Sequence, residues 1–283
     1  MDLSGKIALV TGASRGVGAA TAVALAQAGC SVACAARSTK DAPQRTAGTL
    51  DETVDRIKST GGNGLAVPTN LADRGSVRAM VARTVEHFGG LDILINNAAV
   101  QFIGDLEQPE HRHDLTFAVN YWAPCIAIQE SSAHMDHRGG GAIINVSSLA
   151  ALIPIPQMLS YGTSKIALEH LTLDAARVLY PKKITVNCFR IDIAVASEGF
   201  MANTPGADHS TWEPCEVPAE GILWMLRQPP TYTGRRESMF HLRAREGIMP
   251  TRLADGGQRD ATPTELFDGL NEAYSSNFAE PYD

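Results

Sequence analysis

Residues 11–18 read TGASRGVG and directly follow the apolar run KIALVT at 6–11. Gly12 permits a tight turn, Gly16 lets a diphosphate approach the backbone closely, and Gly18 allows close helix packing. The helix that follows adds free N–H groups and the positive end of its dipole. A glycine-rich turn that binds nothing is the alternative, but the position between a first strand and a helix favours a dinucleotide site.

Short apolar runs alternate with longer segments of helical periodicity on both sides of this turn. The strand candidates are KIALVT, SVACAA, GLAVPT, LDILIN, GAIINVS and ITVNCF, and the helical segments are 11–28, 49–60, 74–88, 108–137 and 157–180. Strict alternation of this kind predicts an α/β fold, namely a doubly wound parallel sheet of about seven strands with helices on both faces.

Local signals predict several boundaries. Thr49 and Glu52 have the spacing of a capping box, and the pair of glycines at 61–62 ends the same helix. The polar loop STKDAPQRTAG at 38–48 is longer than most strand–helix connections. We expect one dinucleotide-binding domain over 1–245, followed by a tail over 246–283 that wraps the surface or is partly disordered.

Composition excludes several classes of protein. The formal net charge is −7, with no basic block or stripe to offset it, which argues against a nucleic-acid partner. The five cysteines show no paired short spacing, so we expect neither a disulfide framework nor a metal site. No signal peptide begins the chain, and no run approaches about 18 apolar residues, the length of a membrane span. A cytoplasmic protein is the resulting expectation.

The end of the second strand candidate bears on the choice of cofactor. A dinucleotide fold that selects NAD usually places an acid there, to bind the ribose 2′-hydroxyl. Here the sequence reads CAARSTK, with Arg37 at this place and no acid before Asp41. A guanidinium can pair with a 2′-phosphate through two hydrogen bonds, and Arg15 in the glycine turn can approach the same phosphate. We predict NADP(H) as the preferred cofactor, with NAD(H) possible. The alternative is that either arginine is a solvated surface charge.

Further along the chain, Tyr161 and Lys165 stand four residues apart in SYGTSKIAL, so on a helix they share a face. Ser148 precedes Tyr161 by thirteen residues, and Asn120 lies in FAVNYWAP. Together with TGASRGVG and the NNAA that follows the fourth strand candidate, these motifs span roughly residues 5–240. In their order and spacing the chain resembles a short-chain dehydrogenase/reductase of the standard single-domain type.

The resemblance implies an NAD(P)-dependent oxidoreductase that interconverts a ketone and a secondary alcohol by hydride transfer. Tyr161 would be the acid/base group, Ser148 would hydrogen-bond the carbonyl oxygen, and Lys165 would hold the cofactor ribose. Because an ammonium and a positive nicotinamide both favour the ionised phenol, we expect the pKa of Tyr161 to fall towards neutrality. The expected catalytic residues are Asn120, Ser148, Tyr161 and Lys165. The expected cofactor-binding residues are Gly12, Ser14, Arg15, Gly16, Val17, Gly18, Arg37, Asn70, Leu71, Asn97, Ala98, Tyr161, Lys165 and Ser197.

The backbone carbonyl of Asn120 is affected by a nearby proline. Pro124 follows it by four residues and has no N–H to give to the Asn120 carbonyl. We predict a kink that holds a water between Asn120 and Lys165, as part of a proton path. A kink needed only for packing is the alternative.

The chain departs from the family pattern after the sixth strand candidate. Where the family has Pro-Gly, this sequence has Ile191-Asp192, and the hydroxyl usually found a few residues later is supplied by Ser197, unless Ala196 aligns there. Asn70 stands where the family has an acid near the adenine. The family's final DGG is missing after MFHL.

The segment LAALIPIPQML joins Ser148 to Tyr161, and with the loop at 192–215 it would line one wall of a substrate cleft. A hydrophobic carbonyl or alcohol substrate fits such a wall. The alternative is that Leu152, Ile153 and Ile155 only pack beneath the loop. HRHD at 111–114 suggests a solvated helix face in preference to a metal site.

Two other functions stay open from the sequence. One is a cofactor-binding regulator or scaffold without catalysis, although such a protein would be expected to lack the tyrosine or lysine. The other is an epimerase or dehydratase of the related longer-chain group, whose glycine spacing and larger substrate domain do not match. The resemblance also implies a homotetramer or homodimer formed through the helices at 108–137 and 157–180.

Overall fold

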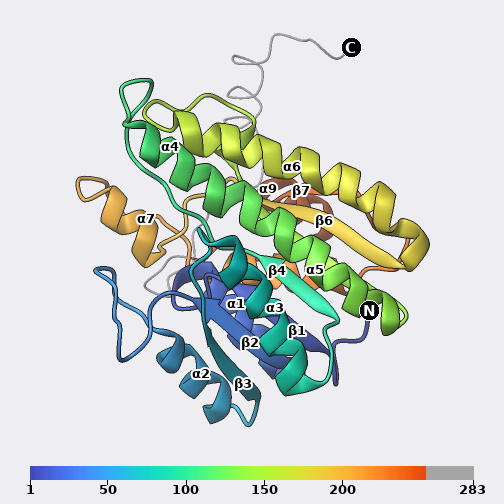
Figure 1. Cartoon of the computed structure of the whole chain (residues 1–283). Coiled ribbons are helices and arrows are strands. Elements are labelled where there is room, and N and C mark those ends of the chain that lie inside the picture. Colours follow the sequence, from blue (N-terminus) through green and yellow to red (C-terminus); the bar gives the residue numbers. More distant parts are fainter. Residues whose placement is uncertain (253–283) are drawn as a thin grey trace, which may run out of the picture.

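A computed structural model describes residues 1–252 of the chain. Its centre is a seven-stranded sheet in the order β3-β2-β1-β4-β5-β6-β7, in which every neighbouring pair is parallel (Figure 1). The strands are β1 Ile7–Thr11, β2 Ser31–Ala36, β3 Asn63–Pro68, β4 Ile93–Asn96, β5 Gly141–Ser148, β6 Ile184–Ile191 and β7 Arg236–Ser238. The predicted fold class is confirmed.

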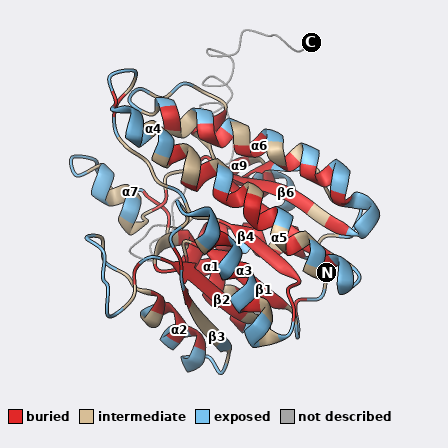
Figure 2. Cartoon of the chain, in the orientation of Figure 1, coloured by how far each residue is buried: buried red, intermediate tan, exposed pale blue. Residues whose placement is uncertain are grey.

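Helices cover both faces of this sheet. They are α1 Gly16–Gln27, α2 Leu50–Ser59, α3 Arg74–Phe88, α4 Glu110–Phe117, α5 Ala123–His137, α6 Leu159–Leu179, α7 Glu198–Asn203, α8 Glu216–Leu226 and α9 Met239–Glu246. α1, α2, α8 and α9 contribute to one apolar core, whereas α3, α5 and α6 contribute to the other. The strands are buried between the layers, and the outward faces of the helices are exposed (Figure 2).

The alternation of side chains along the strands explains the two cores. In β1, Ala8 and Val10 belong to the core beneath α1, while Ile7 and Leu9 face the core beneath α3. Successive side chains of a strand point to opposite faces. Because both faces are covered, the first six strands are largely apolar, which is why short apolar runs were sufficient to predict them.

The predicted boundaries can be compared with the structure at several places. The capping box is confirmed: Glu52 donates its N–H to the Thr49 hydroxyl at 3.2 Å, and its carboxylate accepts the Thr49 N–H at 3.0 Å. The helix ends at Ser59, just before the two glycines. The loop at 38–48 contains no helix or strand.

The C-terminal part is more regular than the sequence suggested. β7, α7, α8 and α9 were not identified from the sequence, because each is short or lies outside the strict alternation. Past α9, Met249 is 1% exposed and joins the core beneath α1 and α8. The expected tail at 246–283 therefore begins with packed residues, and its part at 253–283 lies outside the described residues.

Candidate active site

The glycine turn lies at the carboxyl end of β1, in the centre of the sheet. Gly12 and Gly16 have φ angles of +69° and +59°, which favour glycine. A Cβ on Gly18 would lie 2.4 Å from the Gly12 carbonyl oxygen, so only glycine allows α1 to pack this closely. The tight turn at Gly12 and the close packing at Gly18 agree with the predicted roles, whereas the approach of a diphosphate to Gly16 stays a prediction.

The N-terminus of α1 is suited to an anion. Its N-cap residue, Arg15, makes no side-chain capping bond, and the first turn holds no acidic residue. The first N–H groups of a helix lack partners within the helix and favour negative charge. The turn also borders a cavity of about 500 Å³ that continues to Tyr161 and Lys165. These features fit a dinucleotide whose diphosphate lies at the helix end.

Asn97 holds the turn in place from the neighbouring strand. Its side-chain amide donates to the Thr11 carbonyl at 2.9 Å, and the Thr11 hydroxyl accepts the N–H groups of Asn97 and Ala98 at 3.0 and 3.1 Å. Both Asn97 and Ala98 line the cavity. The structure therefore gives the Asn97 side chain a partner in the protein as well as a place beside the cofactor site.

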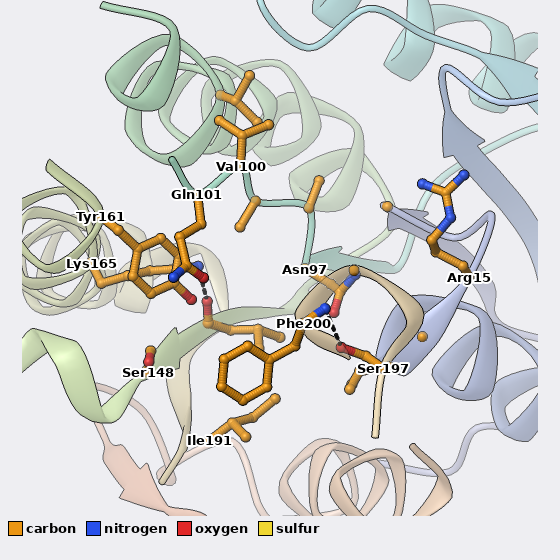
Figure 3. A pocket seen from close by; sticks show the side chains of 18 of the residues that line it. Arg15, Asn97, Val100, Gln101, Ser148, Tyr161, Lys165, Ile191, Ser197 and Phe200 are labelled. Atoms are coloured by element: carbon orange, nitrogen blue, oxygen red, sulfur yellow. Dashed lines mark hydrogen bonds between the residues drawn. The ribbon is translucent and has the colours of Figure 1, made fainter. Parts of the chain in front are cut away.

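The two arginines differ in their surroundings; Figure 3 shows Arg15. The Arg15 guanidinium donates to the carbonyls of Thr46, Ala47 and Gly48 at 2.8, 2.6 and 3.0 Å, and so ties the glycine turn to the long loop. Arg37 is exposed beside the cavity and makes no hydrogen bond or ion pair within the described chain. Of the two, Arg37 has the free guanidinium.

Asn70 and Leu71, which were expected to bind the cofactor, also line the cavity. The side-chain oxygen of Asn70 accepts the Ala72 N–H at 3.2 Å, and the backbone N–H of Asn70 donates to the Ser76 hydroxyl at 3.0 Å. Ser14 and Val17 line the same cavity, whereas Gly18 does not and serves the packing of α1.

Tyr161, Ser148 and Lys165 come together at the other end of the cavity (Figure 3). Ser148, at the end of β5, lies close enough to the Tyr161 phenol for its hydroxyl to lower the pKa of that phenol. The Lys165 ammonium lies 5.6 Å from the centre of the Tyr161 ring and donates to the Val146 carbonyl at 2.8 Å. The turn of α6 between residues 161 and 165 brings both side chains to the same face, as predicted.

The expected pKa of Tyr161 needs correction. Burial raises the pKa of the Tyr161 phenol, and the bond from Ser148 opposes this rise only in part. Burial also lowers the pKa of Lys165 to about 8, against smaller raising effects from Cys188 and Glu169. A nearby ammonium and a positive nicotinamide were expected to favour the ionised phenol, whereas removal of the phenol from water acts in the opposite direction and is the largest effect in this structure.

Asn120 lies in a break of the regular α-helix. Residues Ala118–Trp122 form a π-helical turn between α4 and α5, so the predicted irregularity before Pro124 is confirmed. The Asn120 side chain is fully buried: it accepts the Val100 N–H at 2.8 Å and donates to the Val100 carbonyl and to the Ser164 hydroxyl, each at 3.0 Å. The predicted water between Asn120 and Lys165 stays a prediction.

Comparison with known proteins agrees with this arrangement. The family model for short chain dehydrogenase matches residues 6–197. This chain belongs to the short-chain dehydrogenase/reductase family.

Individual relatives span much of the chain. This chain is 36% identical over 183 residues to a 3-oxoacyl-(acyl-carrier-protein) reductase of Staphylococcus aureus, and the match covers 64% of this chain and 72% of the relative. It is 34% identical over 186 residues to versicolorin reductase of Emericella nidulans, covering 65% and 67%. A mutant short-chain dehydrogenase/reductase of Serratia marcescens superposes with a TM-score of 0.74 at 32% identity, covering 84% of this chain and 97% of that one.

In this short-chain dehydrogenase/reductase, Asp192 of the altered Pro-Gly site lines the cavity, but its carboxylate is bound within the protein. Its carboxylate accepts from the Ser238 hydroxyl and, at 3.1 Å, from the Phe240 N–H, so it ties β6 to the start of α9. Burial raises the pKa of Asp192. Ser197 lines the cavity and caps α7, whereas Ala196 does not line it, which favours Ser197 in the open alignment.

The substrate side of the cavity is largely apolar. Leu149, Ile155 and Met158, from the segment between Ser148 and Tyr161, face it, but Leu152 and Ile153 do not. The apolar wall was therefore predicted in part. The loop at 192–215 contributes as predicted, through residues such as Ile193 and Phe200. Other apolar residues were missed because they come from distant segments: Val100, Leu115, Val119 and Ile191. Gln101, which follows NNAAV, was also missed.

Three remaining expectations concern features outside this cavity. All five cysteines are free, and Cys30, Cys34 and Cys188 are buried. In HRHD, His113 contacts the Ser160 hydroxyl, and no cluster of three or more potential ligands for a metal occurs among the described residues. Within residues 1–252, no helix has the length and apolarity to span a membrane.

Proposed function

We propose that this protein is an NADP-preferring oxidoreductase that interconverts a hydrophobic ketone and the corresponding secondary alcohol, with Tyr161 as the acid/base group. The family as a whole uses NAD(P) and acts on ketone/alcohol pairs, which supports the general reaction. The observation that carries the proposal is that Tyr161, Ser148 and Lys165 lie together in a cavity that continues to the glycine turn, with the Lys165 ammonium 5.6 Å from the centre of the Tyr161 ring. We place the enzyme in the cytoplasm.

When bound, NADPH supplies a hydride to the carbonyl carbon. Tyr161 donates its phenolic proton to the carbonyl oxygen, and Ser148 hydrogen-bonds the same oxygen and orients it. Lys165 lies within reach of the tyrosine ring, where its positive charge favours the tyrosinate that remains. Asn120 acts as a positioning residue, because it fixes the Val100 backbone and the Ser164 side chain behind the site.

The first prediction concerns Tyr161→Phe. This change removes the proton donor and keeps the ring, so we expect turnover of ketones to fall by at least about a thousandfold, while NADPH binding, followed by fluorescence, is kept. General acid catalysis alone contributes about 10²–10⁴-fold. Tyr180→Phe is the matched control, because Tyr180 is 52% exposed at the end of α6. Retained activity in Tyr161→Phe would refute the assignment. A wild type that binds NADPH but reduces no ketone would favour the alternative, a regulator.

The second prediction concerns cofactor choice. The Arg37 guanidinium has no partner within residues 1–252, so Arg37→Ala should raise the KM for NADPH by about tenfold or more and leave the KM for NADH within about twofold, since a charge-assisted bond contributes about 1.5–3 kcal/mol. Arg15 already donates to three carbonyls, so Arg15→Ala should weaken the binding of NADPH and of NADH to a similar degree. A wild-type kcat/KM with NADH that equals or exceeds that with NADPH would contradict the NADP preference.

A further inference from the structure

Gln101 is a polar side chain in the apolar part of the cavity. It follows Val100 in the segment between β4 and α4, and in Figure 3 its side chain extends from this segment towards the Tyr161 ring. Its amide nitrogen is buried and makes no hydrogen bond with any residue in the described part of the chain. A buried donor without a partner is rare in native proteins and points to a partner that binds later.

The position of Gln101 is held from behind. The fully buried Asn120 bonds both the N–H and the carbonyl of Val100, at 2.8 and 3.0 Å. The backbone directly before Gln101 is therefore anchored to the helix that carries the π turn. A side chain on an anchored segment presents its amide to the cavity in a defined place, as a binding group requires.

Three other polar side chains that line the cavity are already engaged within the protein. Lys165 donates to Val146, Asp192 accepts from Ser238 and Phe240, and Asn97 donates to Thr11. Among the residues that the structure describes, Gln101 combines a buried, uncommitted amide nitrogen with a place beside apolar walls formed by residues such as Met158 and Phe200.

The reacting carbonyl oxygen does not need this amide. A carbonyl oxygen has two lone pairs, and under the proposed function Tyr161 and Ser148 take both of them. A hydrogen bond from Gln101 would serve a different atom of the substrate. Because an amide offers one donor group and one acceptor, the partner can be a carbonyl or a hydroxyl oxygen.

We propose that Gln101 is a specificity-determining residue, which hydrogen-bonds a second oxygen of the substrate. The substrate class is then a hydrophobic ketone that carries a further carbonyl or hydroxyl group, in preference to a simple ketone. This inference rests on the proposed function and narrows it. A site built to bond an oxygen disfavours an analogue that lacks it, because the buried amide then stays unpaired.

The test compares matched ketones with one and two oxygens: 2-octanone with 2,3-octanedione, and 1-decalone with decalin-1,5-dione. We expect the wild type to favour the dicarbonyl of at least one pair by about tenfold or more in kcat/KM. Gln101→Met keeps the length of the side chain and removes the amide, so this ratio should fall at least fivefold. Met158→Leu, a change of an apolar wall, should move both ketones of a pair together and keep the ratio within about twofold.

The outcomes separate this proposal from the function on which it rests. If the wild type reduces the ketones and Tyr161→Phe does not, but Gln101→Met leaves the ratio unchanged, Gln101 has no role in specificity and only the present inference fails. Equal losses of kcat/KM for both ketones of a pair in Gln101→Met would indicate that the amide serves the cofactor. That result would also overturn the present inference. If the wild type reduces none of the four ketones, the proposed function fails and the inference falls with it. Thermal unfolding of each variant checks that it is folded.

Discussion

At the scale of single residues, two buried groups set the chemistry of the site. Burial raises the pKa of Tyr161, so the phenol keeps its proton near neutral pH and is available as a donor. Burial lowers the pKa of Lys165 to about 8, so the ammonium is present at neutral pH and is lost in mildly alkaline solution. Near neutrality this pair of states suits ketone reduction better than alcohol oxidation.

The pKa shifts of Tyr161 and Lys165 predict how the rate of ketone reduction depends on pH. We expect kcat/KM for ketone reduction to be steady below about pH 8 and to fall above it, because Lys165 then loses the positive charge that stabilises the tyrosinate formed in the reaction. The measurement is a profile from pH 6 to 10 at constant ionic strength. Lys182→Met, which removes a surface lysine paired with Asp136, should keep the profile. A rate constant that stays level to pH 9.5 would contradict the role given to Lys165.

At the scale of elements, α6 is tied to the sheet by a buried ion pair. Glu169, one turn after Lys165, accepts from Arg190 of β6 at 2.9 and 2.7 Å and from the Ser147 hydroxyl of β5 at 2.8 Å. Both charged side chains are buried. The tie holds the helix that carries Tyr161 and Lys165 against the strand that carries Ser148.

Breaking this pair on one side should be costly. Glu169→Gln leaves the buried Arg190 charge without its carboxylate, so we expect the free energy of unfolding in urea to fall by about 3–5 kcal/mol. The double variant Glu169→Leu/Arg190→Leu should lose less stability, because neither charge of the buried pair remains. Asp174→Asn, in an exposed ion pair of the same helix, should change stability by less than about 1 kcal/mol. A free energy of unfolding for Glu169→Gln within about 0.5 kcal/mol of the wild-type value would argue against this tie.

At the scale of the whole molecule, exposed apolar side chains gather on one pair of neighbouring helices. Ile166 and Val178 on α6 are 40% and 57% exposed, and Trp122 just before α5 is 43% exposed. α5 and α6 pack side by side on the same face of the sheet (Figure 1). These are the helices through which the family resemblance implies assembly.

We therefore propose a homo-oligomer formed through α5 and α6. Ile166→Glu should convert it to a smaller species, because the new charge would be buried at the interface. Light scattering after size exclusion gives the mass directly. Leu106→Glu is the control, since Leu106 is 85% exposed but lies between β4 and α4, away from both helices. A wild type that elutes as a monomer at micromolar concentration would exclude this assembly.

Much of the molecule could be predicted from local patterns. The apolar runs predicted the first six strands, the glycines at 12, 16 and 18 predicted the turn, and Thr49 with Glu52 predicted a helix start that the structure confirms. Tyr161, Ser148 and Lys165 were brought together as their spacing implied. Such features depend on backbone preferences and on neighbours close in the chain.

Only the tertiary structure decided how several side chains are used. Arg15 bonds carbonyls more than thirty residues away, and Asp192 bonds residues of β7 and α9. The direction of the Tyr161 pKa and the unpaired amide of Gln101 likewise depend on burial by distant segments. The sequence by itself determined the fold and the kind of chemistry, because both follow from local periodicity and motif spacing. The partner and the solvation of each side chain arise only when the strand ends and their loops meet at one edge of the sheet.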